Sequence, residues 1–344
     1  MRARLMFGVL TGLFFLGSAC SKQAPKVDSL PPRLDGGIDA VTKDGTPVGD
    51  LRVDQSAADA KTVGDARPTP CITDKTAGHR VYSCQGIAFD VTVPGQCVGG
   101  TKPCGLVIDT HGFSMNAKMQ DNSTAMAELG KKHGYIVIQP NANPKPPLSS
   151  WSDKDDAKVV DFIKQAIAAW KIDEKRVHFT GFSQGGAMTW RMICKHSDLF
   201  ASVAPAAFCN TGFGVDCFTA NKLPAREIPI LYMHGKKDAL INFSCATPKV
   251  KSVTAAWKMS KQTVLQTSAG SKRTRYENAN GSVFEFLQHD YSAKAVLIRG
   301  HCFPGSKDHN GGVLGQFFGF ACAEPSTFVW GEEAMKFFIA HPKK

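Results

Sequence analysis

Residues 21–70 lack the aromatic side chains that a folded core needs. They contain no phenylalanine, tryptophan, tyrosine or cysteine, and they are rich in aspartate, proline, glycine, alanine and lysine. A segment of this composition cannot bury enough apolar surface to offset the entropy lost when it becomes ordered. We therefore predict a flexible tether over residues 21–70 and one folded body over residues 71–344, which is long enough for a large core.

Long apolar runs are also scarce. The stretch from Leu5 to Leu16 follows a basic start and is too short to span a bilayer as a stop-transfer helix. It ends in small residues before Cys20, which predicts an export signal over residues 1–20 with Cys20 lipidated, as at a bacterial lipobox. Gly17 stands where a larger aliphatic residue is usual, so cleavage near Ala19 without lipidation is the alternative. Both interpretations predict an exported protein.

Motifs for metals and nucleic acids are missing as well. The cysteines show no C-x-x-C spacing, and no basic run is interleaved with aromatic residues. The formal net charge of +11 includes a group of lysines between residues 154 and 175, which we interpret as a solvated helix face. We expect no metal, no cofactor and no nucleic-acid partner.

The cysteines support export. Apart from Cys20, the remaining ten lie in the body, an even number that an oxidising compartment would pair. Spacing does not fix the connectivity, but a turn-rich insert between Cys97 and Cys104 favours a short loop there. The other expected pairs are Cys71–Cys84, Cys209–Cys217, Cys302–Cys322 and, by remainder, Cys194–Cys245.

The body alternates short apolar runs with helical segments, which predicts a mainly parallel sheet covered by helices on both faces. The expected strands are 87–93, 105–109, 135–139, 176–180, 201–205, 228–233, 282–287 and 293–299. The expected helices are 122–133, 155–170, 187–194, 250–259 and 330–340.

The stretch Gly181-Phe-Ser-Gln-Gly-Gly186 fits the pattern G-x-S-x-G. It lies between a predicted strand and a predicted helix, which is the setting of a nucleophile elbow. The strained turn needs small residues beside the serine and raises the Ser183 hydroxyl above the sheet edge. A glycine-rich turn with an incidental serine is the alternative interpretation. The elbow predicts Ser183 as a catalytic nucleophile.

A serine hydroxyl needs a histidine to accept its proton and a carboxylate to orient that histidine. In this fold class the chain order is serine, acid, histidine. Asp238 follows a predicted strand and is the expected acid, with Asp216 and Asp290 as alternatives. His301 follows the last predicted strand and is the expected base; the alternatives are His289 and His309.

The reaction also needs backbone N–H donors for the oxyanion. We expect one from Gln184, after the nucleophile, and one from Phe113, in the loop that follows the strand at 105–109. His111 and His234, each followed by glycine, are interpreted as structural loop residues.

With these residues placed, the chain resembles exported polyhydroxybutyrate depolymerases and feruloyl and acetylxylan esterases of the α/β-hydrolase fold. The resemblance extends from Gly105 to the end. It depends on His111-Gly-Phe, Gln139-Pro, Trp151, Asp155-Asp, Asp173-Glu-Lys-Arg-Val, Thr180-Gly-Phe-Ser-Gln-Gly-Gly-Ala-Met, Phe200-Ala-Ser-Val-Ala-Pro, His234-Gly with Asp238, and Gly300-His-Cys-Phe-Pro-Gly.

The resemblance implies a metal-independent serine hydrolase of carboxylic esters. It places Trp151 near the active site, where a core aromatic is the alternative, and puts Phe303 where the family usually has a tryptophan. Both are expected to bind substrate. A polyester such as polyhydroxybutyrate and an aromatic or acetyl ester of a polysaccharide are the two substrate hypotheses. A third hypothesis is a non-catalytic lipoprotein that keeps the fold as a binding module in the cell envelope.

Overall fold

The computed structural model describes residues 70–344 except 211, 213, 220, 221, 308–318 and 324. The chain divides into two units between Pro68 and Thr69, and all described residues lie in the second unit. The predicted export signal, Cys20 and the predicted tether up to residue 69 lie outside the described residues, as does His309.

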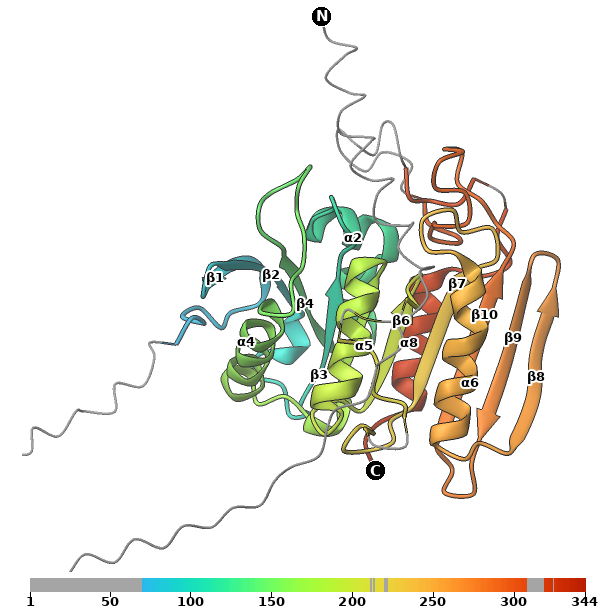
Figure 1. Cartoon of the computed structure of the whole chain (residues 1–344). Coiled ribbons are helices and arrows are strands. Elements are labelled where there is room, and N and C mark those ends of the chain that lie inside the picture. Colours follow the sequence, from blue (N-terminus) through green and yellow to red (C-terminus); the bar gives the residue numbers. More distant parts are fainter. Residues whose placement is uncertain (1–69, 211, 213, 220–221, 308–318, 324) are drawn as a thin grey trace, which may run out of the picture. The chain divides into compact units, whose positions relative to one another are not determined.

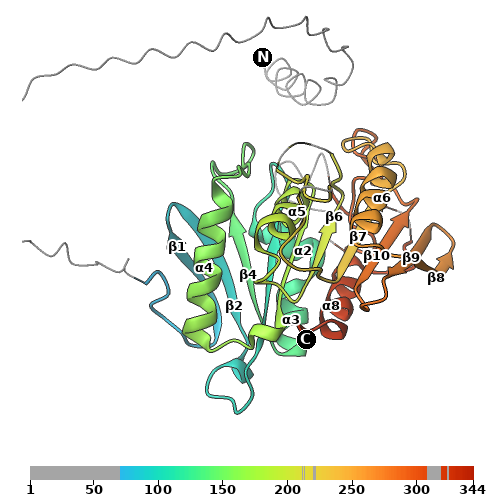
Figure 2. The same ribbon diagram turned by 60° about the horizontal axis from the view of Figure 1, so that its bottom comes forward.

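A ten-stranded sheet forms the centre of this unit, in the order β1-β2-β4-β3-β5-β6-β7-β10-β9-β8 (Figure 1). The strands from β4 to β10 in this order are parallel. The pairs at both edges are antiparallel, and β1 and β8 lie at opposite ends of the sheet (Figure 2). The bounds are β1 Gly78–Cys84, β2 Ile87–Val93, β3 Gly105–Thr110, β4 Tyr135–Asn141, β5 Val177–Phe182, β6 Ser202–Ala206, β7 Ile230–Gly235, β8 Lys261–Ser268, β9 Ser271–Glu277 and β10 Val283–His289.

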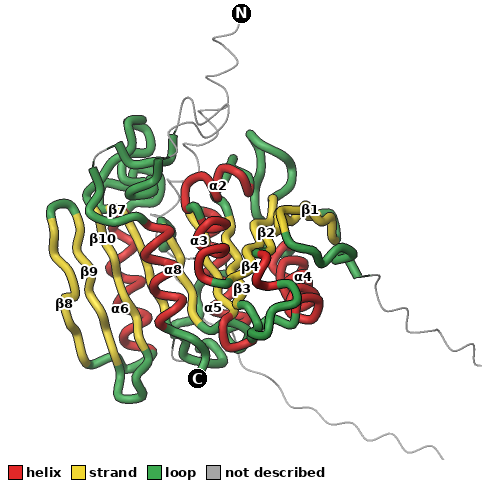
Figure 3. The backbone as a smooth tube through the Cα atoms, turned by 180° about the vertical axis from the view of Figure 1, so that it is seen from behind, coloured by secondary structure: helices red, strands yellow, loops and turns green. Residues whose placement is uncertain are grey.

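Helices cover both faces of the sheet. α4, α5 and α6 lie on one face, and α2, α3 and α8 lie on the other (Figures 1 and 3). Each face has its own core: Phe162 and Trp190 lie in one, and Met126 and Trp330 lie in the other. The helices are α2 Ala117–Thr124, α3 Met126–His133, α4 Asp155–Trp170, α5 Gln184–His196, α6 Ala246–Ala256 and α8 Trp330–Ala340. This arrangement confirms the predicted α/β-hydrolase fold.

The central strands and α4 form where the sequence patterns predict them. All residues of β3 and β5 are buried, as expected of parallel strands that are covered on both sides. α4 buries residues at helical spacing, among them Val159, Phe162 and Ile163, and carries two aspartates in its first turn. The predicted bounds of α4 and α8 match the structure.

Three predicted elements need correction. Residues 293–299 form turns and isolated bridges instead of a strand, so β10 is the last strand along the described part of the chain. The single helix predicted over 122–133 is two helices, because Ala125 adopts a left-handed conformation with φ of 53°. The helix predicted over 250–259 is α6, Ala246–Ala256, so its start and end were both placed too late. The strands β1, β8 and β9 were not predicted.

Five disulfides join the ten cysteines of the body. Three confirm the expected pairs, Cys71–Cys84, Cys97–Cys104 and Cys302–Cys322. The other two expected pairs are wrong, because the cysteines pair as Cys194–Cys217 and Cys209–Cys245. Cys209 follows β6 and Cys245 lies in the chain that follows the neighbouring strand β7, so parallel pairing brings their Cα atoms to 5.5 Å. Sequence proximity alone could not show this.

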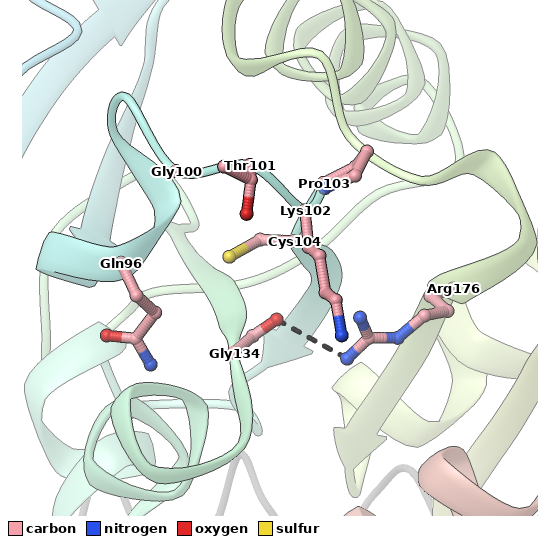
Figure 4. Close-up of a pocket in the computed structure, with 8 residues that line it drawn as sticks. All are labelled: Gln96, Gly100, Thr101, Lys102, Pro103, Cys104, Gly134 and Arg176. Atoms are coloured by element: carbon pink, nitrogen blue, oxygen red, sulfur yellow. Dashed lines mark hydrogen bonds between the residues drawn. The ribbon is translucent and has the colours of Figure 1, made fainter.

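A pocket lies at the amino-terminal edge of the parallel strands. Its lining includes Lys102, Gly134 and Arg176 beside the Cys97–Cys104 disulfide (Figure 4). The Arg176 guanidinium lies 4.3 Å from the centroid of the Tyr135 ring and donates to the carbonyl oxygens of His133 and Gly134, at the end of α3. Arg176 thus caps this helix, whose carbonyl end favours a cation. The pocket therefore lies at the edge of the sheet opposite Ser183, and its residues stabilise the fold.

Candidate active site

Ser183 lies at the tight turn between β5 and α5. Its φ of 54° and ψ of −116° are rare for a residue with a side chain. The Ser183 N–H donates to the carbonyl of Ala206 on β6, at 2.9 Å, which ties the turn to the neighbouring strand. Strain of this kind persists only where the surroundings fix the backbone, and it is typical of functional residues.

The glycines of the motif are needed for close packing. A Cβ atom on Gly181 would lie 2.1 Å from Thr110 Oγ1, and one on Gly185 would lie 2.2 Å from the Thr110 carbonyl oxygen. A Cβ on Gly186 would lie 2.3 Å from the Ala206 carbonyl oxygen. Real Cβ atoms do not approach so closely, so only glycine lets the elbow pack between β3 and β6. This accounts for the spacing G-x-S-x-G-G.

Asp238 and His301 lie together at the carboxyl-terminal edge of the sheet. Asp238 Oδ2 lies 2.7 Å from His301 Nδ1, and both side chains are buried. The other carboxylate oxygen, Oδ1, accepts the backbone N–H groups of Leu240 and Ile241, at 2.9 and 2.8 Å. The carboxylate is therefore held at both oxygens and fixes the orientation of the imidazole.

Aromatic packing links this pair to the elbow. The His301 ring centroid lies 4.7 Å from that of Phe182, the residue directly before Ser183. The Phe182 ring packs at a tilt against Phe303, with centroids 4.0 Å apart, and Phe320 approaches both Phe182 and His301. Of the expected residues, the structure thus brings Asp238 and His301 into contact with each other and beside the turn that carries Ser183.

The two alternative acids bind other partners, and His289, the alternative base that the structure describes, is buried away from Asp238 hydrogen bonding. Asp216 accepts from the Gly212 N–H and is paired with Lys249, and Asp290 forms an exposed pair with Lys236. His289 is buried at the end of β10, where burial lowers its pKa to about 3. No hydrogen bond between any of these side chains and His301 or Asp238 is present among the described residues.

The predicted oxyanion loop passes beside the serine. A Cβ atom on Gly112 would lie only 3.1 Å from Ser183 Cβ, so the backbone before Phe113 runs next to the hydroxyl-bearing carbon. The loop is held by the Ser114 N–H, which donates to the Ser149 carbonyl at 2.9 Å. Gln184 begins α5, where the first N–H groups have no partner within the helix.

The side chains of Gln184, Trp151 and His111 fix the loops around the elbow. Gln184 Oε1 accepts the Trp151 backbone N–H at 2.8 Å, and the Trp151 indole N–H donates to the His111 carbonyl at 2.9 Å. His111 Nε2 lies 3.0 Å from the Ala142 N–H, and burial lowers the His111 pKa to about 4. Because its Nε2 accepts a backbone hydrogen bond, His111 has the geometry of a structural loop residue.

Trp151 and Phe303, the two expected substrate-binding residues, are both buried. Trp151 is 5% exposed and Phe303 is fully buried. The Trp151 ring packs against His111 and the Phe303 ring packs against Phe182, so both rings lie close to the elbow. Trp151 is thus part of the core that supports the site, and contact of either residue with substrate stays a prediction.

A polar cluster that the sequence did not reveal supports the strand before the oxyanion loop. Asp109, near the end of β3, is fully buried and accepts hydrogen bonds from Gln120, Gln139 and Thr124 at 2.7 to 3.0 Å. Burial raises the pKa of the Asp109 carboxyl from 3.8 to about 6, although these hydrogen bonds act to lower it. The three partners are far from Asp109 along the chain, so no local motif marks the cluster.

We expect Asp109→Asn to change the pH dependence of stability. Because the folded-state pKa of Asp109 lies above the ordinary value, its contribution is greatest below pH 4 and is lost as the pH rises through about 6. The shift corresponds to about 3 kcal/mol. The cluster can accommodate asparagine if the Gln120 amide flips. The flip turns Gln120 Oε1, which is buried without a hydrogen-bond partner, toward the new NH₂ group. Urea unfolding should show the variant gaining on the wild type between pH 4 and 7, and a constant difference would contradict the assignment.

The described part of the chain contains no cluster of three or more histidine, cysteine, aspartate or glutamate residues able to hold a metal ion. Within the same residues, no helix is long and apolar enough to cross a membrane.

Comparison with known proteins identifies related sequences. Residues 149–288 match a family described as Phospholipase/Carboxylesterase. The chain is 27% identical over 213 residues to a bifunctional acetylxylan esterase/xylanase of Neocallimastix patriciarum, covering 59% of this chain and 29% of that protein. It is 29% identical over 152 residues to feruloyl esterase B of Piromyces equi, covering 42% and 28%.

A third relative is poly(3-hydroxyalkanoate) depolymerase C of Paucimonas lemoignei, 26% identical over 163 residues, which cover 44% of this chain and 34% of that protein. A solved thermostable esterase is 18% identical, with a TM-score of 0.49 over 77% of this chain and 63% of that one. The matches span no more than about a third of each of the three curated relatives. The sequence matches confirm the resemblance to acetylxylan esterases, feruloyl esterases and polyhydroxyalkanoate depolymerases, at modest identity.

Proposed function

We propose that this chain is an exported serine esterase that hydrolyses carboxylic esters through an acyl-enzyme. The observation that carries the proposal is the buried Asp238–His301 pair, 2.7 Å apart, beside the strained turn of Ser183. The similarity to esterases supports the same reaction class.

The proposed reaction uses each residue for one task. Ser183 Oγ attacks the ester carbonyl carbon while His301 Nε2 accepts its proton, and Asp238 holds the Nδ1–H and stabilises the imidazolium. The N–H groups of Phe113 and Gln184 donate to the developing oxyanion, each contributing about 3 kcal/mol. Collapse of the intermediate expels the alcohol, which takes the proton from His301. Water then attacks the acyl-serine by the same route and releases the acid.

For the substrate, we favour a polyester of the polyhydroxybutyrate type or its oligomers. The match to a polyhydroxyalkanoate depolymerase supports this proposal. An acetyl or feruloyl ester of a polysaccharide is the second candidate, because the 213-residue match to an acetylxylan esterase/xylanase extends over more of this chain. The alternative from a different functional class is a non-catalytic binding module.

We further propose that residues 71–344 form the catalytic domain, preceded by the tether and the export signal. Acylation of Cys20 would anchor the protein to a membrane of the bacterial envelope, and cleavage without acylation would release it. The five disulfides of the body support an oxidising location.

A fluorophosphonate probe tests the reaction class. The wild-type chain should react at Ser183, mapped by mass spectrometry of the adduct, and should release acid from hydroxybutyrate oligomers, methyl ferulate or acetylated xylan. The preferred substrate of this panel separates the two ester candidates. An unlabelled Ser183 in a folded protein that hydrolyses none of these esters would favour the binding module and contradict the proposal.

A further inference from the structure

His234 lies beneath the loop that carries Asp238 and has no assigned role in the reaction. It is the second-last residue of β7, and its side chain is completely buried. Its Nε2 lies 2.8 Å from the Ile241 carbonyl oxygen and 3.5 Å from Asp238 Oδ2. Its Nδ1 lies 2.7 Å from the hydroxyl of Tyr232. The imidazole therefore joins the core of the sheet to the loop of the proposed acid.

The partners define the tautomer of His234. Nε2 faces two acceptors, a carbonyl and a carboxylate, so it carries the proton. Nδ1 faces a tyrosine hydroxyl and accepts from it. Burial lowers the pKa of His234, although the Asp238 charge acts to raise it, and burial also holds the pKa of Tyr232 well above its ordinary value. Both side chains are thus neutral, and the hydrogen bonds run from Tyr232 to His234 to Ile241.

Ile241 connects this chain of hydrogen bonds to the carboxylate. Its N–H donates to Asp238 Oδ1 at 2.8 Å, while its carbonyl accepts from His234. The peptide groups on both sides of Ile241 are therefore fixed, one by the acid and one by the histidine. The Cys209–Cys245 disulfide ties the chain just after this turn to the chain that follows β6. Cys209 Sγ also lies 3.7 Å from His234 Nδ1. Without His234, the partly buried Ile241 carbonyl would lose its donor and the turn would lose its attachment to β7.

We infer that His234 is a positioning residue of the proposed active site, with its Nε2–H holding the turn Asp238–Ile241 and Tyr232 holding its tautomer. Because the inference rests on the proposed function, it predicts an effect on the rate of the chemical step, with little effect on substrate binding. His234 itself touches neither the substrate nor Ser183 in this role.

Two substitutions at His234 distinguish the roles of its two ring nitrogens. Glutamine places an amide N–H near the position of Nε2, whereas asparagine reaches only as far as Nδ1. We expect His234→Asn to lower kcat about 30- to 100-fold with KM within about threefold of wild type. His234→Gln should retain kcat within about fivefold. The assay is hydrolysis of a short p-nitrophenyl ester by the full chain, with folding checked by thermal unfolding.

A matched control is His178, a fully buried histidine at the amino-terminal end of β5, bonded to Ser202 Oγ at 2.8 Å. His178→Asn should lower thermal stability without a selective loss of kcat. Equal losses in the two His234 variants, or a His234→Asn variant with unchanged kcat, would overturn the inference.

Two further measurements keep the test decisive if His234→Asn does not fold. Tyr232→Phe removes only one hydroxyl and should lower kcat a few-fold. Nitrogen-15 NMR of the wild type should find the His234 proton on Nε2, and a proton on Nδ1 would overturn the inference.

The Ser183→Ala variant distinguishes failure of this inference from failure of the proposed function. Full hydrolysis by that variant means that the proposed function fails, whereas Ser183-dependent hydrolysis with no effect at His234 means that this inference alone fails.

Discussion

Replacement of Ser183 by alanine is expected to lower kcat/KM for short esters by about 10⁵-fold, a loss of about 7 kcal/mol of transition-state stabilisation. Alanine has no nucleophile, so the acyl-enzyme cannot form, and only the oxyanion donors and substrate binding remain. The fold should be retained, because alanine adds no atom to the tight turn where Ser183 has its φ of 54°. Initial rates with p-nitrophenyl acetate and butyrate measure the effect.

The control for this prediction is Ser252→Ala, which changes an exposed serine on α6. It should hydrolyse the same esters at the wild-type rate. Both variants should unfold at temperatures close to that of the wild type. If the Ser183 variant kept more than about a hundredth of the activity in a preparation free of contaminating esterases, Ser183 would not be the nucleophile.

The elbow could be predicted because its determinants are local. Gly181, Gly185 and Gly186 are required by contacts with β3 and β6, and the strand, turn and helix that surround Ser183 are continuous in the chain. The order serine, aspartate, histidine then indicated Asp238 and His301, since the carboxyl ends of parallel strands meet at one edge. The structure brings these two side chains into contact, and their roles in catalysis stay a prediction.

Other elements depend on features that the sequence pattern does not contain. Residues 293–299 have the apolar composition of a strand, yet Val296 is 71% exposed and Leu297 is 43% exposed, and only Ile298 of these three is buried. The strands β8 and β9 are polar: β8 is largely exposed at the edge of the sheet, β9 beside it is mostly half-buried, and neither has the apolar alternation that predicts a strand. Apolar composition thus predicts burial wrongly at residues 293–299, whereas β8 and β9 are strands that an apolar pattern does not mark.

The supports of the site could not be predicted because they connect distant segments. Asp109 draws its hydrogen bonds from α2 and β4, and His234 holds a loop through a backbone carbonyl. A backbone contact of this kind leaves no trace in side-chain spacing. The disulfides show the same limit, since Cys209–Cys245 depends on the adjacency of β6 and β7.

Asp238→Asn is expected to lower kcat/KM about 10⁴-fold, because it forces His301 into the wrong tautomer. The N–H groups of Leu240 and Ile241 point at the Oδ1 position and require an acceptor there. The amide oxygen of asparagine must occupy that position, and its NH₂ group then faces His301 Nδ1. To accept this hydrogen bond, Nδ1 must lose its proton to Nε2, and a protonated Nε2 cannot accept the proton of Ser183.

The matched control is Asp290→Asn, which removes the charge of an alternative acid that is 40% exposed and paired with Lys236. Its effect on kcat/KM should be less than about threefold, because Asp290 pairs with Lys236 while Asp238 holds His301. Nitrogen-15 NMR of the Asp238 variant should place the His301 proton on Nε2, in contrast to Nδ1 in the wild type. Retained activity in Asp238→Asn together with a loss in Asp290→Asn would transfer the role of the acid to Asp290. Because both substitutions replace one carboxylate oxygen by NH₂ and keep the side-chain volume, a difference between them reports the position of the charge relative to His301.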